Sequence, residues 1–287
     1  MKRFITYIIK LFLPMVLIME LICSLLLLDS SISEKIGIQR GFLNIRSLVY
    51  DRSQEAIDDT AIHIGDSVAR QLFPPFRKDA NLTSVANVLA SGNYIAIKNA
   101  LENNPEITTV YYGAIPTSLS LDFYEKKTSL NFIKPFLSIY RPGFLDGTIL
   151  KAMMTQPKSL LYLTSFGKFI PMDDINFGKE TIKGRKISRF SLRYILKMKE
   201  LCDEHNVKFI MYCPPLSSER KGATNDFSTL RTQKYPAGLK KLLRNYMNTI
   251  KYRDAKDYKD GTHLKRDYLK EARKQYSGIV QRMNNTY

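Results

Sequence analysis

Cysteine and histidine are scarce in this chain of 287 residues, which has three of each. Cys23 lies in a long apolar run, so only Cys202 and Cys213 remain elsewhere. Two cysteines cannot build a disulfide framework, although one bridge between them stays open, and burial as apolar side chains is the simpler expectation. The sequence also has no cluster of residues with metal-ligand spacing. We therefore expect neither a metal nor a cofactor.

Nucleic-acid recognition is a second function class that the sequence does not favour. It has neither zinc-finger spacing nor an aromatic RNA-binding motif, although its formal net charge is +17. Much of the positive charge lies in residues 179–199 and 231–274. Two interpretations stay open: ordinary solvated helix faces, or a basic face that attracts an anionic surface polymer or phospholipid head groups.

Long apolar runs are also rare, and one of them, residues 5–28, has the length of a membrane span. Lys2 and Arg3 precede it, and Glu20 is a costly interruption. The run exceeds the core of a signal peptide and lacks a good cleavage site. A buried core helix is the alternative, but the pattern favours a membrane anchor over residues 1–30. The rest of the chain is then expected on the extracytoplasmic side, periplasmic or at the cell surface.

After a connector over residues 31–58, strand-like and helix-like patterns alternate through residues 59–287. The expected strands are Ala61–Ile64, Thr83–Val88, Ile107–Tyr112, Val207–Tyr212 and a stretch around Lys251–Arg253. Helical patterns include Tyr94–Asn103 and Leu192–His205. This alternation predicts an α/β fold: a three-layer αβα sandwich around a parallel sheet of about five strands.

The interval 116–187 does not follow the alternation. It is rich in Phe, Tyr, Leu and Pro, and a compact α/β domain seldom carries so long a bare loop. We expect a mostly helical insertion over the carboxyl edge of the sheet, where open α/β sheets bind ligands. Such an insertion would form much of the wall above the ligand-binding edge of the sheet.

The stretch "IGDSVARQL" places Ser67 where the first predicted strand becomes a helix. A serine there lies at the sheet's carboxyl edge and at the positive end of a helix dipole. This position suits a nucleophile whose reaction develops negative charge. It also suits an ordinary helix cap.

A serine nucleophile needs a base, and His263 is the best of the three histidines. His63 is expected to pack within the first strand, and His205 to lie at a helix end. His263 stands in "KDGTHL", three residues after Asp260 on a glycine-containing turn. Such a turn lets the carboxylate bind the imidazole Nδ1–H, leaving Nε2 to take a proton from Ser67. An Asp cap beside a solvent-facing histidine is the alternative for this fragment alone.

Together, "IGDSVARQL" and "DGTHL" resemble the signatures of the SGNH, or GDSL-type, serine hydrolase superfamily. "VLASGN" falls where that family has its second block, so the resemblance assigns an oxyanion donor to Gly92. It implies ester chemistry with Ser67, Asp260 and His263 as the triad, and with the Ser67 and Gly92 amides facing the oxyanion. The implied function is a membrane-anchored hydrolase or O-acyltransferase for acyl esters of envelope or surface carbohydrate.

The third block departs from the family pattern. "YYGAIPTSL" has Ile115 where the family usually has an asparagine that donates to the oxyanion. Thr117, Ser118 or Asn93 are candidate replacements, and loss of one such donor costs about 10²–10³ in rate. The departure leaves open a second hypothesis, a binding component of a surface-polysaccharide modification system that has a hydrolase fold and little or no activity.

Overall fold

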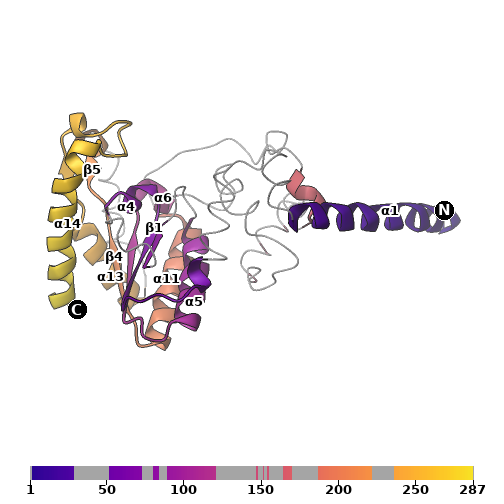
Figure 1. Cartoon of the computed structure of the whole chain (residues 1–287), viewed down its shortest axis with the longest axis horizontal. Helices are drawn as coiled ribbons and strands as arrows, with labels where there is room; N and C mark the ends of the chain where they lie inside the picture. Colours follow the sequence, from indigo (N-terminus) through magenta and orange to yellow (C-terminus); the bar gives the residue numbers. More distant parts are fainter. Residues whose placement is uncertain are drawn as a thin grey trace. The chain divides into compact units, whose positions relative to one another are not determined.

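The structure is a computed structural model that describes residues 2–28, 52–72, 80–83, 89–120, 147, 151, 154, 164–169, 187–221 and 236–286. The chain divides into two compact units. The first comprises Met1–Leu43 and Tyr124–Lys179, and the second comprises Asn44–Phe123 and Glu180–Tyr287. Figure 1 shows the whole chain.

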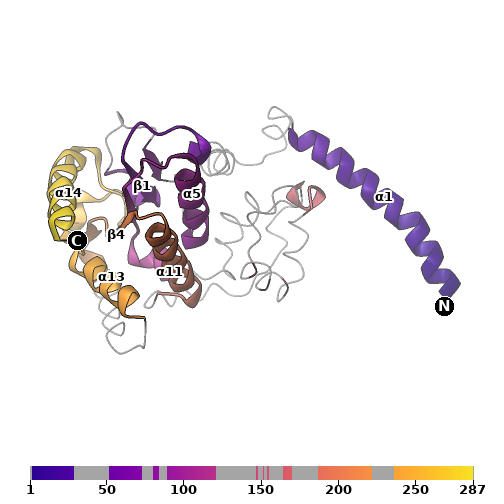
Figure 2. The ribbon, with the colours of Figure 1, turned by 90° about the horizontal axis from the view of Figure 1, so that it is seen from below.

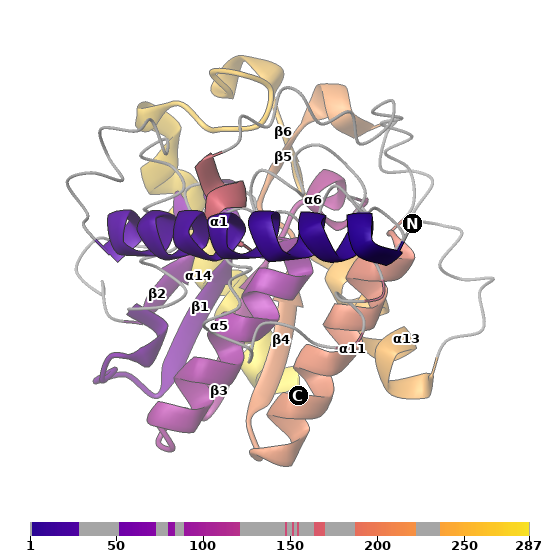
Figure 3. The ribbon, with the colours of Figure 1, turned by 90° about the vertical axis from the view of Figure 1, so that its right-hand side faces the viewer.

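The second unit is built on a parallel sheet of four strands in the order β2-β1-β3-β4. The strands are β1 (Ala61–Gly65), β2 (Asn81–Thr83), β3 (Thr109–Gly113) and β4 (Lys208–Tyr212). Their side-by-side arrangement is visible in Figure 3. Strands β2 and β3 flank β1 on opposite sides, so the strand order reverses there. Ligands of open α/β sheets bind at such a switch point, beyond the carboxyl ends of the strands.

Helices cover both faces of this sheet, which confirms the α/β fold. Helices α5 (Leu89–Asn103) and α11 (Arg189–Glu204) lie on one face, and α13 (Ala237–Asn248) and α14 (Arg266–Thr286) lie on the other (Figure 2). Helix α5 includes the predicted stretch Tyr94–Asn103, and α11 includes the predicted stretch Leu192–His205 except for its last residue, which caps the helix. Strands β3 and β4 are almost wholly buried, as expected for parallel strands covered by helices on both faces.

The prediction of a fifth strand in this sheet is wrong. Residues Tyr252–Arg253 form β6, which pairs in parallel with β5 (Leu216–Ser217) in a separate two-stranded sheet. The chain continues past the end of β4 through Cys213-Pro214-Pro215 before β5 begins. Proline provides no backbone N–H for a ladder, so a break in the main sheet at this point is physically reasonable. The expected strands at 61–64, 107–112 and 207–212 are present as β1, β3 and β4. The second, expected over Thr83–Val88, shares only Thr83 with β2, and residues 84–88 lie outside the described residues.

Residues 52–58, expected as the end of the connector, pack against the second unit. The short helix η1 (Arg52–Gln54) contacts α5, and the amide nitrogen of Asn99 donates to the Ser53 hydroxyl at 3.0 Å. The Ile57 amide donates to the side-chain oxygen of Asn104 at 2.8 Å. These buried contacts make the segment part of the domain.

In the first unit, the apolar N-terminal run forms the helix α1 (Lys2–Leu28), and many of its large apolar side chains are exposed. Among the described residues, no helix is both long enough and apolar enough to cross a membrane. The anchor therefore stays a prediction.

Glu20, the acidic interruption in that run, has partners in the same unit. Its carboxylate accepts the amide N–H groups of Ser165 at 2.5 Å and Phe166 at 3.0 Å, where the short helix η5 (Phe166–Phe169) begins. Ser24 adds a hydroxyl contact to Ser165 at 2.9 Å. These hydrogen bonds explain how an acidic side chain is accommodated in an apolar helix. Most of the expected insertion at 116–187, including its proposed wall above the serine, lies outside the described residues.

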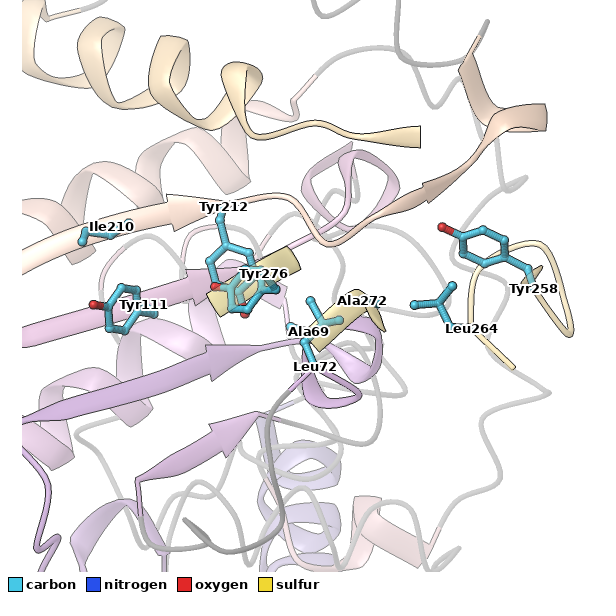
Figure 4. Packing of buried hydrophobic residues seen from close by; sticks show 9 residues of the cluster. All are labelled: Ala69, Leu72, Tyr111, Ile210, Tyr212, Tyr258, Leu264, Ala272 and Tyr276. Carbon is cyan, nitrogen blue, oxygen red and sulfur yellow. The ribbon is translucent and has the colours of Figure 1, made fainter. Parts of the chain in front are cut away.

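Behind the carboxyl edge of the sheet, aromatic and aliphatic side chains form one packed cluster. It joins the short helix α4 (Ser67–Arg70) to β3, β4 and α14, as Figure 4 shows. Its members are Ala69, Leu72, Tyr111, Ile210, Tyr212, Tyr258, Leu264, Ala272 and Tyr276. Burial of this apolar surface fixes α4 and α14 against the sheet, so the residues above the cluster start from a rigid base.

Candidate active site

The turn that carries Ser67 depends on a close approach between two glycines. Gly65 ends β1 with φ +146°, and a Cβ at this position would lie 2.0 Å from the carbonyl oxygen of Gly113. Gly113 is its register partner at the end of β3, and it too has no room for a side chain, because a Cβ would lie 2.2 Å from the Tyr212 hydroxyl. Only glycine tolerates both this φ and this contact. The two strand ends can therefore meet directly below Ser67.

Asp66 caps the helix that follows. Its Oδ1 accepts the amides of Val68 at 3.0 Å and Ala69 at 3.1 Å. Its Oδ2 accepts the Ser118 hydroxyl at 2.6 Å and the Ile115 amide at 3.4 Å. One carboxylate thus ties the serine turn to the loop after β3. Asp66 satisfies N–H groups that a helix start would otherwise leave without partners.

Burial governs the charge state of Asp66. Removal from water raises the pKa of its carboxyl, against the hydrogen bonds from Ser118 and from the amides of Ala69, Ile115 and Val68, which lower it. The same burial raises the pKa of Tyr112, and the negative charge of Asp66 adds to that effect. The floor of the site is therefore an environment in which ionisation is costly.

Ser67, His263 and Asp260 form one hydrogen-bonded chain. The Ser67 hydroxyl lies 3.0 Å from Nε2 of His263, and Nδ1 of His263 lies 2.8 Å from Oδ2 of Asp260. An ionised carboxylate only accepts hydrogen bonds, so Nδ1 carries the proton and Nε2 accepts from the serine. Ser67 and His263 are both half-buried, with 26% of the His263 side chain exposed. The pair is therefore partly open to solvent, while the hydrogen bond to Asp260 holds the imidazole in place.

Asp260 is oriented by its own turn. Its Oδ1 accepts the amides of Thr262 at 3.0 Å and His263 at 2.6 Å, while Oδ2 faces the imidazole. Partial burial would raise the pKa of this carboxyl, but the backbone and ring hydrogen bonds from His263 and the Thr262 amide outweigh burial and hold it below its usual value. Gly261 has φ +70°, a left-handed conformation that glycine adopts readily. The "DGTH" pattern thus encodes both the turn and the carboxylate–imidazole pair.

Two residues that sequence reasoning missed hold this turn from outside. Arg220, at the end of the short helix η7 (Ser218–Arg220), donates from Nε to the Gly261 carbonyl at 2.9 Å and from Nη2 to the Thr262 hydroxyl at 2.6 Å. The side-chain oxygen of Gln71 accepts the Leu264 amide at 3.1 Å. The four-residue spacing of Ser67 and Gln71 could have indicated Gln71, whereas no local signal marks Arg220.

The structure places the three predicted oxyanion donors, Ser67, Gly92 and Asn93, in different surroundings. The Ser67 amide makes no hydrogen bond to another described residue, which suits it for this role. Gly92 is buried in the first turn of α5, and its role as a donor stays a prediction. The Asn93 side chain is hydrogen-bonded with the buried Tyr112 hydroxyl, so it is already engaged in the core.

The third-block position is apolar in space as well as in sequence. Ile115 is 6% exposed, and its amide points to Asp66. Of the candidate replacements, Ser118 donates its hydroxyl to Asp66. The hydroxyl of Thr117, half-buried in α6 (Pro116–Ser120), makes no hydrogen bond to another described residue. Thr117 is therefore the best remaining candidate for a third donor.

The other histidines lie as the sequence predicts. His63 stacks on Tyr111 with ring centroids 4.9 Å apart, and His205 is the exposed C-terminal cap of α11. Cys202 and Cys213 are each buried and free. Neither the two histidines nor the two cysteines contribute to the Ser67 site. Comparison with family models, with curated proteins and with solved structures found no match to this chain.

Proposed function

We propose that the chain is a serine esterase or O-acyltransferase of the SGNH, or GDSL, type that acts on acyl esters of cell-envelope or surface carbohydrate. The observation that supports this most directly is the hydrogen-bonded chain from Ser67 through His263 to Asp260. It lies at the switch point of a parallel sheet, on a strand-to-helix turn, with the motifs that resemble this family. The carbohydrate class is inferred by analogy with envelope proteins of that family.

In the proposed reaction, the Ser67 oxygen bonds to the acyl carbonyl carbon while its proton passes to Nε2 of His263. The Ser67 amide, and by the resemblance the Gly92 amide, donate to the oxyanion. The bond between the carbonyl carbon and the leaving alkoxide then breaks, and the imidazolium returns the proton to the alcohol. Water or a sugar hydroxyl attacks the acyl-enzyme and loses its proton to His263. The bond between the acyl carbon and the Ser67 oxygen then breaks, and the imidazolium returns the proton to Ser67. Asp260 stabilises the imidazolium in both halves.

A second candidate function is supported by Ile115. A buried isoleucine replaces the asparagine donor of the family pattern, so the chain could be a weakly active or inactive binding component. The intact Ser67–His263–Asp260 contacts favour the enzyme, because a binding protein has no need of an oriented serine and base.

A fluorophosphonate probe separates the two candidates. We expect the full-length chain to be phosphonylated at Ser67, with fluoride leaving and the hydroxyl proton passing to His263, and peptide mass spectrometry locates the adduct. The Ser67→Ala variant should not react. Ser120→Ala is a matched control that removes a hydroxyl bonded to its own helix and should react normally. A folded wild-type chain that stays unlabelled would support the binding component instead.

Attachment to a membrane through residues 5–28, with the α/β unit on the extracytoplasmic side, is part of the same proposal. It is supported by the exposed apolar side chains of α1 and the basic residues at its start. Contact with anionic polymer or phospholipid through the basic helices also stays a proposal, and we propose no nucleic-acid partner, metal or cofactor.

A further inference from the structure

Ser67 and Gln71 occupy the same face of one helical turn. Residues four apart on a helix are neighbours on its surface, and Gln71 continues the α4 geometry with φ −65° and ψ −23°. Ser67 contacts His263, and Gln71 contacts the next residue, Leu264. Two neighbouring positions of the nucleophile helix thus bind two consecutive residues of the turn that carries the base.

The Gln71 side chain links the helix that carries Ser67 to the turn that carries His263. Its side-chain oxygen accepts the Leu264 amide at 3.1 Å, and its own carbonyl accepts Nε of Arg273 in α14 at 3.0 Å. The helix α4 has only four residues and cannot hold its orientation by itself. Gln71 therefore connects α4 both to the base turn and to the helix that follows this turn.

Other contacts hold the turn on its remaining sides but do not reach α4. Arg220 binds Gly261 and Thr262, and the Lys259 amide donates to the His263 carbonyl at 2.9 Å. These bonds set the internal shape of the turn. The position of the turn relative to Ser67 depends on the Gln71 hydrogen bond and on Leu264 packing in the cluster around Ala69.

We propose that Gln71 is a positioning residue that keeps Nε2 of His263 within hydrogen-bonding distance of the Ser67 hydroxyl. This inference rests on the proposed acyl-transfer function. A misplacement of about 1 Å between reacting groups can cost about 10²-fold in rate, so one hydrogen bond at this place has a kinetic effect larger than its effect on stability.

The test compares Gln71→Met with Gln71→Glu in the full-length chain. Methionine keeps the length of the side chain but cannot hold the Leu264 amide, whereas glutamate keeps an acceptor oxygen. With p-nitrophenyl acetate, we expect Gln71→Met to lower kcat by about ten- to a hundredfold with KM little changed. Gln71→Glu should recover most of this loss.

Gln275→Met is the matched control, because it removes the same side chain from an exposed position of α14 that bonds to Arg253 and Glu271 rather than to the turn. Its kcat should equal that of the wild type. Wild-type kcat in a folded Gln71→Met variant would overturn the inference. If that variant does not fold, a loss of about a hundredfold in kcat for Gln71→Glu, which keeps the acceptor oxygen, would overturn it. A wild-type chain that reacts with neither the ester nor the fluorophosphonate probe would overturn the proposed function, and this inference with it.

Discussion

The Ser67 hydroxyl lies 3.0 Å from Nε2 of His263, although 196 positions separate the two residues in the chain. Ser67 comes from the turn after the first strand, and His263 comes from the turn before the last helix. Ser67 follows β1 at the carboxyl edge of the main sheet, whereas the strand that precedes His263, β6, belongs to the separate two-stranded sheet. The hydrophobic cluster around Ala69 and Leu264 holds the two turns together. Their contact is thus a product of the fold.

Substitution of the three chain-forming residues should give losses that do not add. Ser67→Ala, His263→Ala and Asp260→Asn should each lower the rate of fluorophosphonate labelling by about 10³-fold or more, because each interrupts the same proton path. The Ser67→Ala/His263→Ala double variant should lose no more than the worse single variant. Stability should barely change, as judged by urea unfolding. Full labelling of another serine in Ser67→Ala would contradict the assignment.

Asp66 should make stability depend on pH. Its pKa is raised above its usual 3.8 by burial, so its contribution to the free energy of unfolding is fully present below 3.8 and is lost as pH rises through the raised value. Asp66→Asn stays neutral and keeps an acceptor for Val68 and Ala69. The wild type should therefore lose stability relative to Asp66→Asn as pH rises across that window. Urea unfolding at a series of pH values measures this, and parallel curves would refute it.

Thr117 should supply part of the oxyanion stabilisation that Ile115 cannot. Thr117→Val keeps the shape and removes the hydroxyl, and should lower kcat for p-nitrophenyl acetate by about tenfold with little change in KM. Thr117→Ser keeps the hydroxyl and should retain most of the activity. Equal kcat in the valine and serine variants would remove Thr117 from the site.

The proposed localisation predicts that protease added outside the membrane reaches the α/β unit. Protease added to spheroplasts should digest residues 35–287, because the basic residues Lys2 and Arg3 are expected to stay in the cytoplasm. A cytoplasmic marker protein in the same preparation should remain intact. Survival of the α/β unit under these conditions would place it in the cytoplasm and remove the envelope substrate.

Much of the fold could be predicted because its signals are local. The alternation of β-rich runs and helical patterns predicts a parallel sheet with helices on both faces, and short motifs mark Ser67, Asp260 and His263. The Asp260–His263 pair needs only a three-residue turn, so its geometry follows from "DGTH" itself. The prediction of a fifth strand in the main sheet is wrong because the β-propensity of Tyr252–Arg253 does not tell which strand will be its partner.

The sequence by itself determined the candidate nucleophile, base and acid, because such residues are recognised by type and spacing. Only the tertiary structure decided how they are held. The pairing of Gln71 with Leu264 and of Arg220 with Gly261, and the engagement of Asn93 with Tyr112, join residues far apart in the chain. Such contacts depend on which faces the packed helices and strands bring together, so local patterns do not specify these partners.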